Sequence, residues 1–181
     1  MVPFFVQQYK RKDREADDAL MSFVFVSSLV LVAIAMALAP LIAQFMTALN
    51  SSSSANAQKN LVVFFLLFFL PQIFFYAMTA SMQSYLAARS RFITAAFAPI
   101  ANNIVVIATL IYIRSRSAEL DVPLSSIRTS SLIKILAVGT TTGVVIVALI
   151  VAAAYVNAGG RIKLVSLKNP AVPALIGRSK W

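Results

Sequence analysis

The 181-residue sequence contains no cysteine and no histidine. Without cysteine the chain can form no disulfide and offers no thiolate nucleophile or metal ligand. Without histidine it lacks both the most common metal ligand and the side chain that usually acts as a base near neutral pH. Disulfide cross-links, thiolate chemistry and histidine-based catalysis are therefore excluded.

Charge is scarce as well, because only 12% of the residues are charged, whereas 60% are hydrophobic. Soluble domains average roughly 25% charged and 45–50% apolar residues. The mean hydropathy of +0.83 instead indicates an all-α protein that spans a membrane several times. The apolar runs carry no pair of carboxylates, and no glycine-rich phosphate loop follows a strand. We therefore predict that the protein is not an enzyme and holds no cofactor or metal.

Four long stretches contain no Asp, Glu, Lys or Arg, and each exceeds the roughly 20 residues that a membrane helix requires. They cover residues 19–58, 60–88, 92–113 and 135–160. We predict transmembrane helices at about 22–46, 61–86, 93–113 and 132–156, within a membrane region 20–156. Residues 1–19 are expected to form a segment with basic and acidic residues that leads into the first span, and residues 157–181 are expected to form a basic tail.

The distribution of lysine and arginine predicts the orientation of these helices, because cytoplasmic loops are enriched in both residues. With a cytoplasmic N-terminus, eleven cations lie inside and at most five outside. The net charge of +10 is thus spread between apolar runs, which argues against a nucleic-acid partner. Both termini are predicted to be cytoplasmic, and Arg89 and Arg91 to anchor a tight cytoplasmic hairpin. The four acids of the entry segment (Asp13, Glu15, Asp17 and Asp18) are expected on a solvated, salt-bridged surface.

The second predicted span carries a polar stripe. Gln72, Tyr76, Thr79 and Gln83 follow one another at helical spacing, so that all four share one face. Polar groups inside a membrane need partners away from lipid. Two interpretations remain open, namely hydrogen bonds to a neighbouring helix and the lining of a hydrated substrate cavity.

The third span combines a proline with adjacent asparagines. Pro99 here, like Pro71 in the second span, removes a backbone donor and is expected to bend its helix. Asn102 shares a face with Thr109, whereas Asn103 points about 100° away. We expect at least one asparagine to bind a neighbouring helix, and Asn102 is also a candidate cavity residue.

The fourth span contains a GxxxG arrangement. Gly139 and Gly143 would allow another helix to approach closely. Lys134 lies near the outer end of this span. Its ammonium group either reaches the interface or points into a cavity that accepts anions.

Three segments together resemble one known family. The stretches "VPFFVQQYKRKDREADDAL", "LPQIFFYAMTASMQSYLAARSRFITAAFAPIANNIVVI" and "ILAVGTTTGVV" are similar, in order and spacing, to parts of the MurJ/MviN lipid II flippases, of the MOP exporter group. The resemblance runs from residue 2 to 181 and matches the third to sixth of the family's fourteen helices. Pro71, Arg91, Phe92, Pro99 and Asn103 fit the family pattern and are interpreted as shaping and anchoring helices.

The resemblance implies a MATE-like bundle in the bacterial cytoplasmic membrane. Its partners would be membrane lipids, the remaining flippase helices and lipid II, the undecaprenyl-pyrophosphate-linked peptidoglycan precursor, which the family moves by alternating access. The cavity arginines of the family's first two helices have no counterpart here, so no substrate-binding residue is carried over. The candidate cavity residues thus come from the spans alone: Gln72, Thr79, Gln83, Asn102 and Lys134. The alternatives are a small membrane assembly or scaffold protein and a non-functional flippase remnant.

Overall fold

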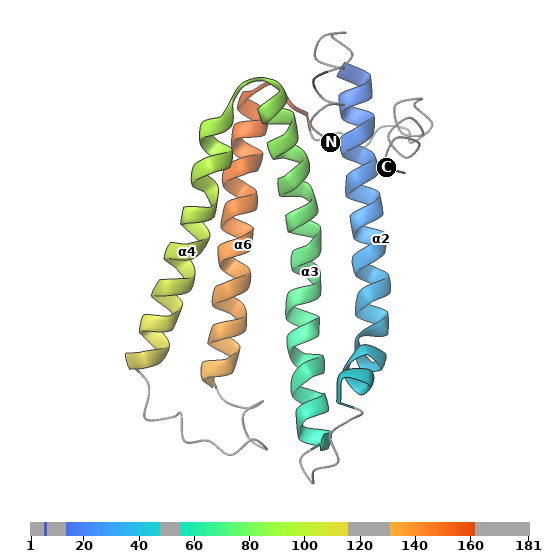
Figure 1. Cartoon of the computed structure of the whole chain (residues 1–181), viewed down its shortest axis with the longest axis vertical. Coiled ribbons are helices and arrows are strands. Elements are labelled where there is room, and N and C mark those ends of the chain that lie inside the picture. The colour runs from blue at the N-terminus through green and yellow to red at the C-terminus, as the bar shows by residue number, and fades with distance from the viewer. Residues whose placement is uncertain (1–5, 7–13, 48–54, 116–130, 162–181) are drawn as a thin grey trace.

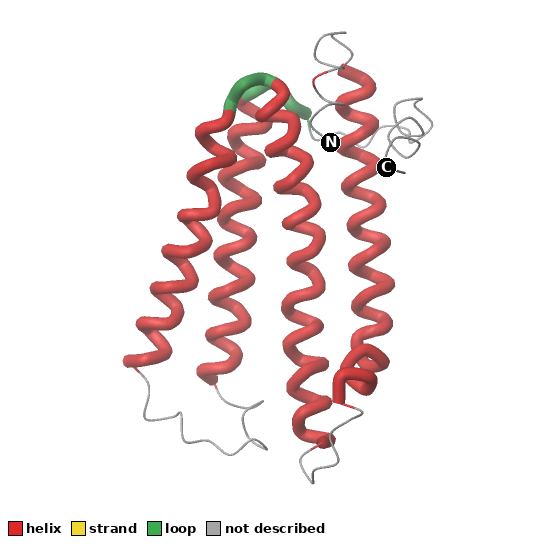
Figure 2. The backbone as a smooth tube through the Cα atoms, in the orientation of Figure 1, coloured by secondary structure: helices red, strands yellow, loops and turns green. Residues whose placement is uncertain are grey.

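The computed structural model of the chain consists of long helices (Figure 1). It describes residue 6 and residues 14–47, 55–115 and 131–161. The helices are α2 (Arg14–Thr47), α3 (Ala55–Ala88), α4 (Phe92–Ser115) and α6 (Ser131–Asn157). No strand occurs among the described residues (Figure 2). The all-α prediction is therefore confirmed.

All four helices are long and apolar enough to cross a membrane. The shortest, α4, has 24 residues and so measures roughly 36 Å at 1.5 Å per residue, more than the hydrocarbon core of about 30 Å. Large apolar side chains such as Phe45, Ile93 and Ile111 lie exposed on the outside of the bundle. Such a surface suits lipid and would not suit water. Among the described residues, four helices long and apolar enough to span a membrane are thus confirmed.

Two helices begin several residues before the spans predicted from the uncharged stretches, and the other two extend past theirs by one or two residues at each end. α2 begins at Arg14, ahead of the predicted start near residue 22. Glu15 and Asp17 lie in its first turn, where acidic side chains interact favourably with the helix dipole. α3 begins at Ala55 because Ala, Gln and Lys favour a helix even where the sequence is too polar to be buried.

The order of the helices in space differs from their order in the chain. α2 packs on α3, α3 packs on α6, and α6 packs on α4, whereas α3 and α4 contact each other only slightly. Figure 1 shows α6 between α3 and α4. The last of the described helices therefore separates two helices that are joined by a tight turn.

One end of the bundle collects the start of α2, the α3–α4 turn and the end of α6, and we refer to it as the turn end (Figures 1 and 2). At the α3–α4 turn, Arg91 N donates to Leu86 O and Ser90 N to Ala87 O, each over 3.0 Å. Ser90 has a φ of 58°. This is the Schellman pattern, which satisfies the last carbonyls of α3 and reverses the chain within a few residues.

The hydrophobic core lies toward the turn end. Its buried members come from all four helices and include Leu20, Met82, Leu86, Ala98 and Tyr155. Phe25 of α2 packs edge-on against Phe74 of α3, with ring centroids 5.2 Å apart. Such edge-to-face contacts add to the packing of buried aromatic rings. The helices are therefore held together most firmly near the α3–α4 turn.

Candidate functional site

The polar stripe of α3 divides into two parts with different surroundings. Gln72 is 7% exposed, and its Nε2 donates a hydrogen bond of 2.8 Å to Thr141 Oγ1 on α6. Thr141 Oγ1 in turn donates to the carbonyl of Ala137 over 2.8 Å. Gln72 thus joins α3 to α6 through a chain of two hydrogen bonds and does not face the cavity described next.

A cavity of about 350 Å³ lies among α3, α4 and α6. Its lining includes Tyr76, Thr79 and Gln83 of α3, Pro99 and Asn102 of α4, and Val144 of α6. Thr79 is buried, whereas Tyr76 and Pro99 are exposed at the cavity's edge. The lining contains hydroxyl and amide groups but no charged side chain. It can therefore exchange hydrogen bonds with a neutral polar group and has no cation for an anion.

Asn102 has the most unusual environment of these residues. Its Oδ1 is buried and has no hydrogen-bond partner among the described residues. A buried acceptor without a donor costs about 1–3 kcal/mol, and this oxygen lies against Gly143 of α6. Asn103, the neighbouring residue, is exposed. Of the two asparagines, Asn102 is the one that lies against α6.

Two glycines allow α4 and α6 to approach closely. A Cβ added at Gly143 would overlap the Asn102 side chain, and one added at Gly139 would overlap Thr109. Asn102 and Thr109 share one face of α4, and the two glycines share one face of α6. The GxxxG of α6 therefore packs antiparallel along this face of α4, and it places Asn102 at the edge of the cavity.

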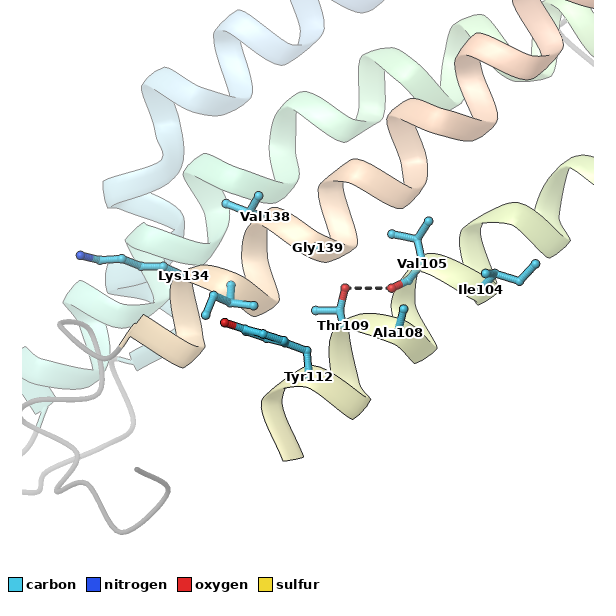
Figure 3. A pocket seen from close by; sticks show the side chains of 9 residues that line it. Ile104, Val105, Ala108, Thr109, Tyr112, Lys134, Val138 and Gly139 are labelled. Carbon is cyan, nitrogen blue, oxygen red and sulfur yellow. Dashed lines mark hydrogen bonds between the residues drawn. The ribbon is translucent and has the colours of Figure 1, made fainter. Parts of the chain in front are cut away.

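Lys134 is not part of this cavity. It is exposed near the start of α6, at the end of the bundle opposite the α3–α4 turn (Figure 1). There it lines a separate, largely apolar groove together with Thr109 and Tyr112 of α4 (Figure 3). Of the five candidate cavity residues, the structure thus brings together Thr79, Gln83 and Asn102, and leaves Gln72 and Lys134 outside.

The prolines lie within continuous helices. α3 runs through Pro71 and α4 through Pro99, and the bends expected at both remain predictions. α2 also contains a proline, Pro40, which sequence analysis did not single out. Pro99 has a second role, since its side chain lines the cavity.

The acidic entry segment differs from expectation at Asp17. Asp17 was expected on a solvated, salt-bridged surface. The salt bridge is present, to Arg89 at 3.0 Å, but Asp17 is only 4% exposed. The guanidinium carbon of Arg89 also lies 3.4 Å from the ring centroid of Tyr85, a cation–π contact. Asp13 lies outside the described residues. A buried charge needs a partner, and helix packing supplies one from a distant part of the sequence.

The contacts that begin at Asp17 and Arg89 continue to α6 through two tyrosines, Tyr85 and Tyr155. Sequence analysis did not single out Tyr85 or Tyr155. The rings of Tyr85 and Tyr155 meet edge-on, with centroids 4.6 Å apart. Tyr155 is fully buried, and its hydroxyl donates to the carbonyl of Arg161 over 3.0 Å. Arg91 Nη1 donates to the carbonyl of Asn157 over 3.5 Å. The only feature of the sequence that could have pointed to Tyr85 and Tyr155 is that each places a hydroxyl group near the end of an apolar span.

The chain was compared with models of known protein families. A family model described as lipid II flippase MurJ matches residues 1–177. No curated protein matches the chain. No solved structure matches it.

Proposed function

The chain belongs to the lipid II flippase MurJ family, and from this premise we propose that its four helices form part of a transporter for lipid II. The substrate would be the peptidoglycan precursor linked to undecaprenyl pyrophosphate, moved by alternating access across the bacterial cytoplasmic membrane. The observation that carries this proposal is the family match over nearly the whole chain. The proposal fits a membrane protein with a hollow among three helices, largely apolar, into which Thr79, Gln83 and Asn102 bring hydroxyl and amide groups. We refer to this hollow as the polar cavity.

The lining of the cavity supports a transporter in which different helices bind different parts of the substrate. Thr79, Gln83 and Asn102 offer neutral donors and acceptors from two helices. These groups suit the hydroxyl and amide groups of a sugar or peptide. They do not suit pyrophosphate, because an ion at the bilayer centre costs at least about 2.5–3.5 kcal/mol unless it is paired. The cations that bind the pyrophosphate would therefore come from the remaining flippase helices, which we propose as partners.

The positions of the helix ends support a topology in which both termini lie on the same side of the membrane. The start of α2, the α3–α4 turn and the end of α6 all lie at the turn end (Figure 1). Arg14, Arg89, Arg91 and Arg161 gather there. Since cytoplasmic flanks are enriched in arginine and lysine, we assign this end to the cytoplasmic side.

The test is a chimaera in which the 181-residue chain replaces the third to sixth helices of a complete family member. Cells depleted of their own flippase should regain growth when they express it. Asn102→Leu and Gln83→Leu should each lower the rescue, because each replaces an amide that can hydrogen-bond to the substrate with an apolar side chain of similar size. Ala96→Leu, on an exposed site of α4 outside the cavity, is the matched control and should rescue fully.

Immunoblotting of membrane fractions would show whether each chimaera accumulates. A chimaera that is present in the membrane but never rescues would contradict the proposed function. Full rescue by both leucine variants would support the flippase function but show that the amide groups of the cavity are not needed for it.

A further inference from the structure

A second hollow lies between α4 and α6, away from the polar cavity and toward the end opposite the α3–α4 turn (Figure 3). It is a groove of about 580 Å³. Ile104, Ala108 and Tyr112 of α4 form one wall, and Lys134, Val138 and Gly139 of α6 belong to the other. The walls are almost wholly apolar. Nothing in the polar cavity or in the ion pair of Asp17 involves these residues.

The hollow lies where α4 and α6 diverge beyond their close contact at two glycines. α4 and α6 approach closely where Gly139 meets Thr109 and where Gly143 meets Asn102, and they separate toward their ends opposite the turn (Figure 1). The Thr109 hydroxyl turns back to donate to the carbonyl of Val105 over 2.8 Å, as Figure 3 shows. The groove therefore presents a methyl-rich floor between two ridges, which include the exposed Ile104 and Val138.

The mouth of the groove has a different chemistry. Lys134 is three residues from the start of α6 at Ser131, and Tyr112 is three residues from the end of α4 at Ser115. At 1.5 Å per residue, both lie roughly 4.5 Å from their helix ends. This is the level at which lysine and tyrosine meet lipid headgroups. In Figure 3 the Tyr112 hydroxyl points toward α6, and the Lys134 side chain extends away from α4.

The groove also has a length suited to a hydrocarbon chain. From Tyr112 to Ile104 it follows eight residues of α4, or roughly 12 Å along the helix. An alkyl chain that enters at the mouth would thus lie along methyl and methylene groups, while its polar head remained level with the lysine. Burial from lipid into such a groove brings no hydrophobic gain, so that packing and charge must decide what binds.

We propose that this groove binds one acyl chain of an anionic phospholipid from the surrounding bilayer, with the phosphate beside Lys134. Lys134 is the one charged side chain among the described lining residues, and a single ammonium group matches the single charge of a phosphodiester. A pyrophosphate carries more charge than one ammonium group can balance. The site therefore favours a bilayer lipid over the transported precursor, and it needs neither flipping nor the polar cavity.

The test uses the full chain in phosphatidylcholine vesicles that contain about one fifth phosphatidylglycerol with a photoreactive diazirine on its acyl chain. Mass spectrometry of the cross-linked peptides maps the labelled residues. We expect labels to concentrate between Ile104 and Tyr112 and between Ile135 and Gly139. Lys134→Gln should lower this labelling about fivefold, the effect typical of one cation near an anionic lipid surface. Lys59→Gln, which removes a cation near the start of α3, should leave it unchanged.

A second pair of variants tests the shape of the groove. Ala108→Phe fills it from an exposed position and should abolish the concentrated labelling, whereas Ala96→Phe elsewhere on α4 should not. Three results would overturn the proposal. They are equal labelling by a phosphatidylcholine probe, labels spread evenly over the exposed faces of α2 and α4, and protein–protein cross-links showing another segment or a second copy seated in the groove.

Discussion

Asp17 in the first turn of α2 and Arg89 in the α3–α4 turn form an ion pair of 3.0 Å, although 72 residues separate them in the chain. Their side chains are only 6% and 14% exposed, so neither charge is well solvated on its own. Arg89 also lies over Tyr85, and Tyr85 packs against Tyr155. One pair of charges therefore links α2, the α3–α4 turn and α6 at the turn end.

Removal of either partner should destabilise the protein strongly. Asp17→Ala or Arg89→Ala leaves a buried charge without its partner, which typically costs about 3–5 kcal/mol. Thermal unfolding in detergent, followed by circular dichroism at the helical band, would show this as a lowered midpoint. Glu15→Ala, an exposed acid in the same turn, serves as the control and should shift the midpoint little.

The doubly neutral variant separates pairing from packing. Asp17→Asn combined with Arg89→Gln leaves no unpaired charge, and we expect it to be more stable than either alanine variant. If the double variant were as unstable as the single ones, the pair would matter through side-chain shape and not through charge.

The orientation of the bundle can be measured directly, because the chain contains no cysteine. Single cysteines would replace Ser53 or Ser90, and intact cells would then be treated with a membrane-impermeant thiol reagent. With the turn end in the cytoplasm, position 53 should be labelled and position 90 should react only after the cells are opened. The reverse pattern would overturn the assigned orientation and the charge argument behind it.

The contact between Gly143 and Asn102 predicts a steric effect that a second mutation should relieve. Gly143→Ala places a Cβ where it overlaps the Asn102 side chain, and overpacking of this kind typically costs about 1–3 kcal/mol. Asn102→Ala in the same chain should recover part of the loss, because it vacates that space. The thermal midpoint reports both effects. Thr142→Ala, on the exposed side of α6, should be nearly silent, and absence of recovery in the double variant would contradict the contact.

The number of spans and the shared face of the polar residues followed from composition and helical periodicity. Those signals are local, since 20 or so apolar residues and a repeat of 3.6 can be recognised without knowing any neighbour. The pairing of Asp17 with Arg89 could not be predicted, because it depends on which helices become adjacent. The insertion of α6 between α3 and α4 has the same origin. It gives Gln72 a partner in Thr141 and moves Lys134 away from Asn102.

The two halves of the polar stripe should differ in their access to water. Gln72 is hydrogen-bonded to Thr141 at 2.8 Å, whereas Thr79 and Gln83 line the cavity. Cysteines at Thr79 and Gln83, in the assembled flippase chimaera, should therefore react with a small water-soluble thiol reagent faster than a cysteine at Gln72. A cysteine at Phe75, outside the cavity lining, sets the level for a site facing lipid or packed protein. Equal protection at all four positions would mean that the cavity is filled by neighbouring helices, and the polar stripe would then serve packing along its whole length.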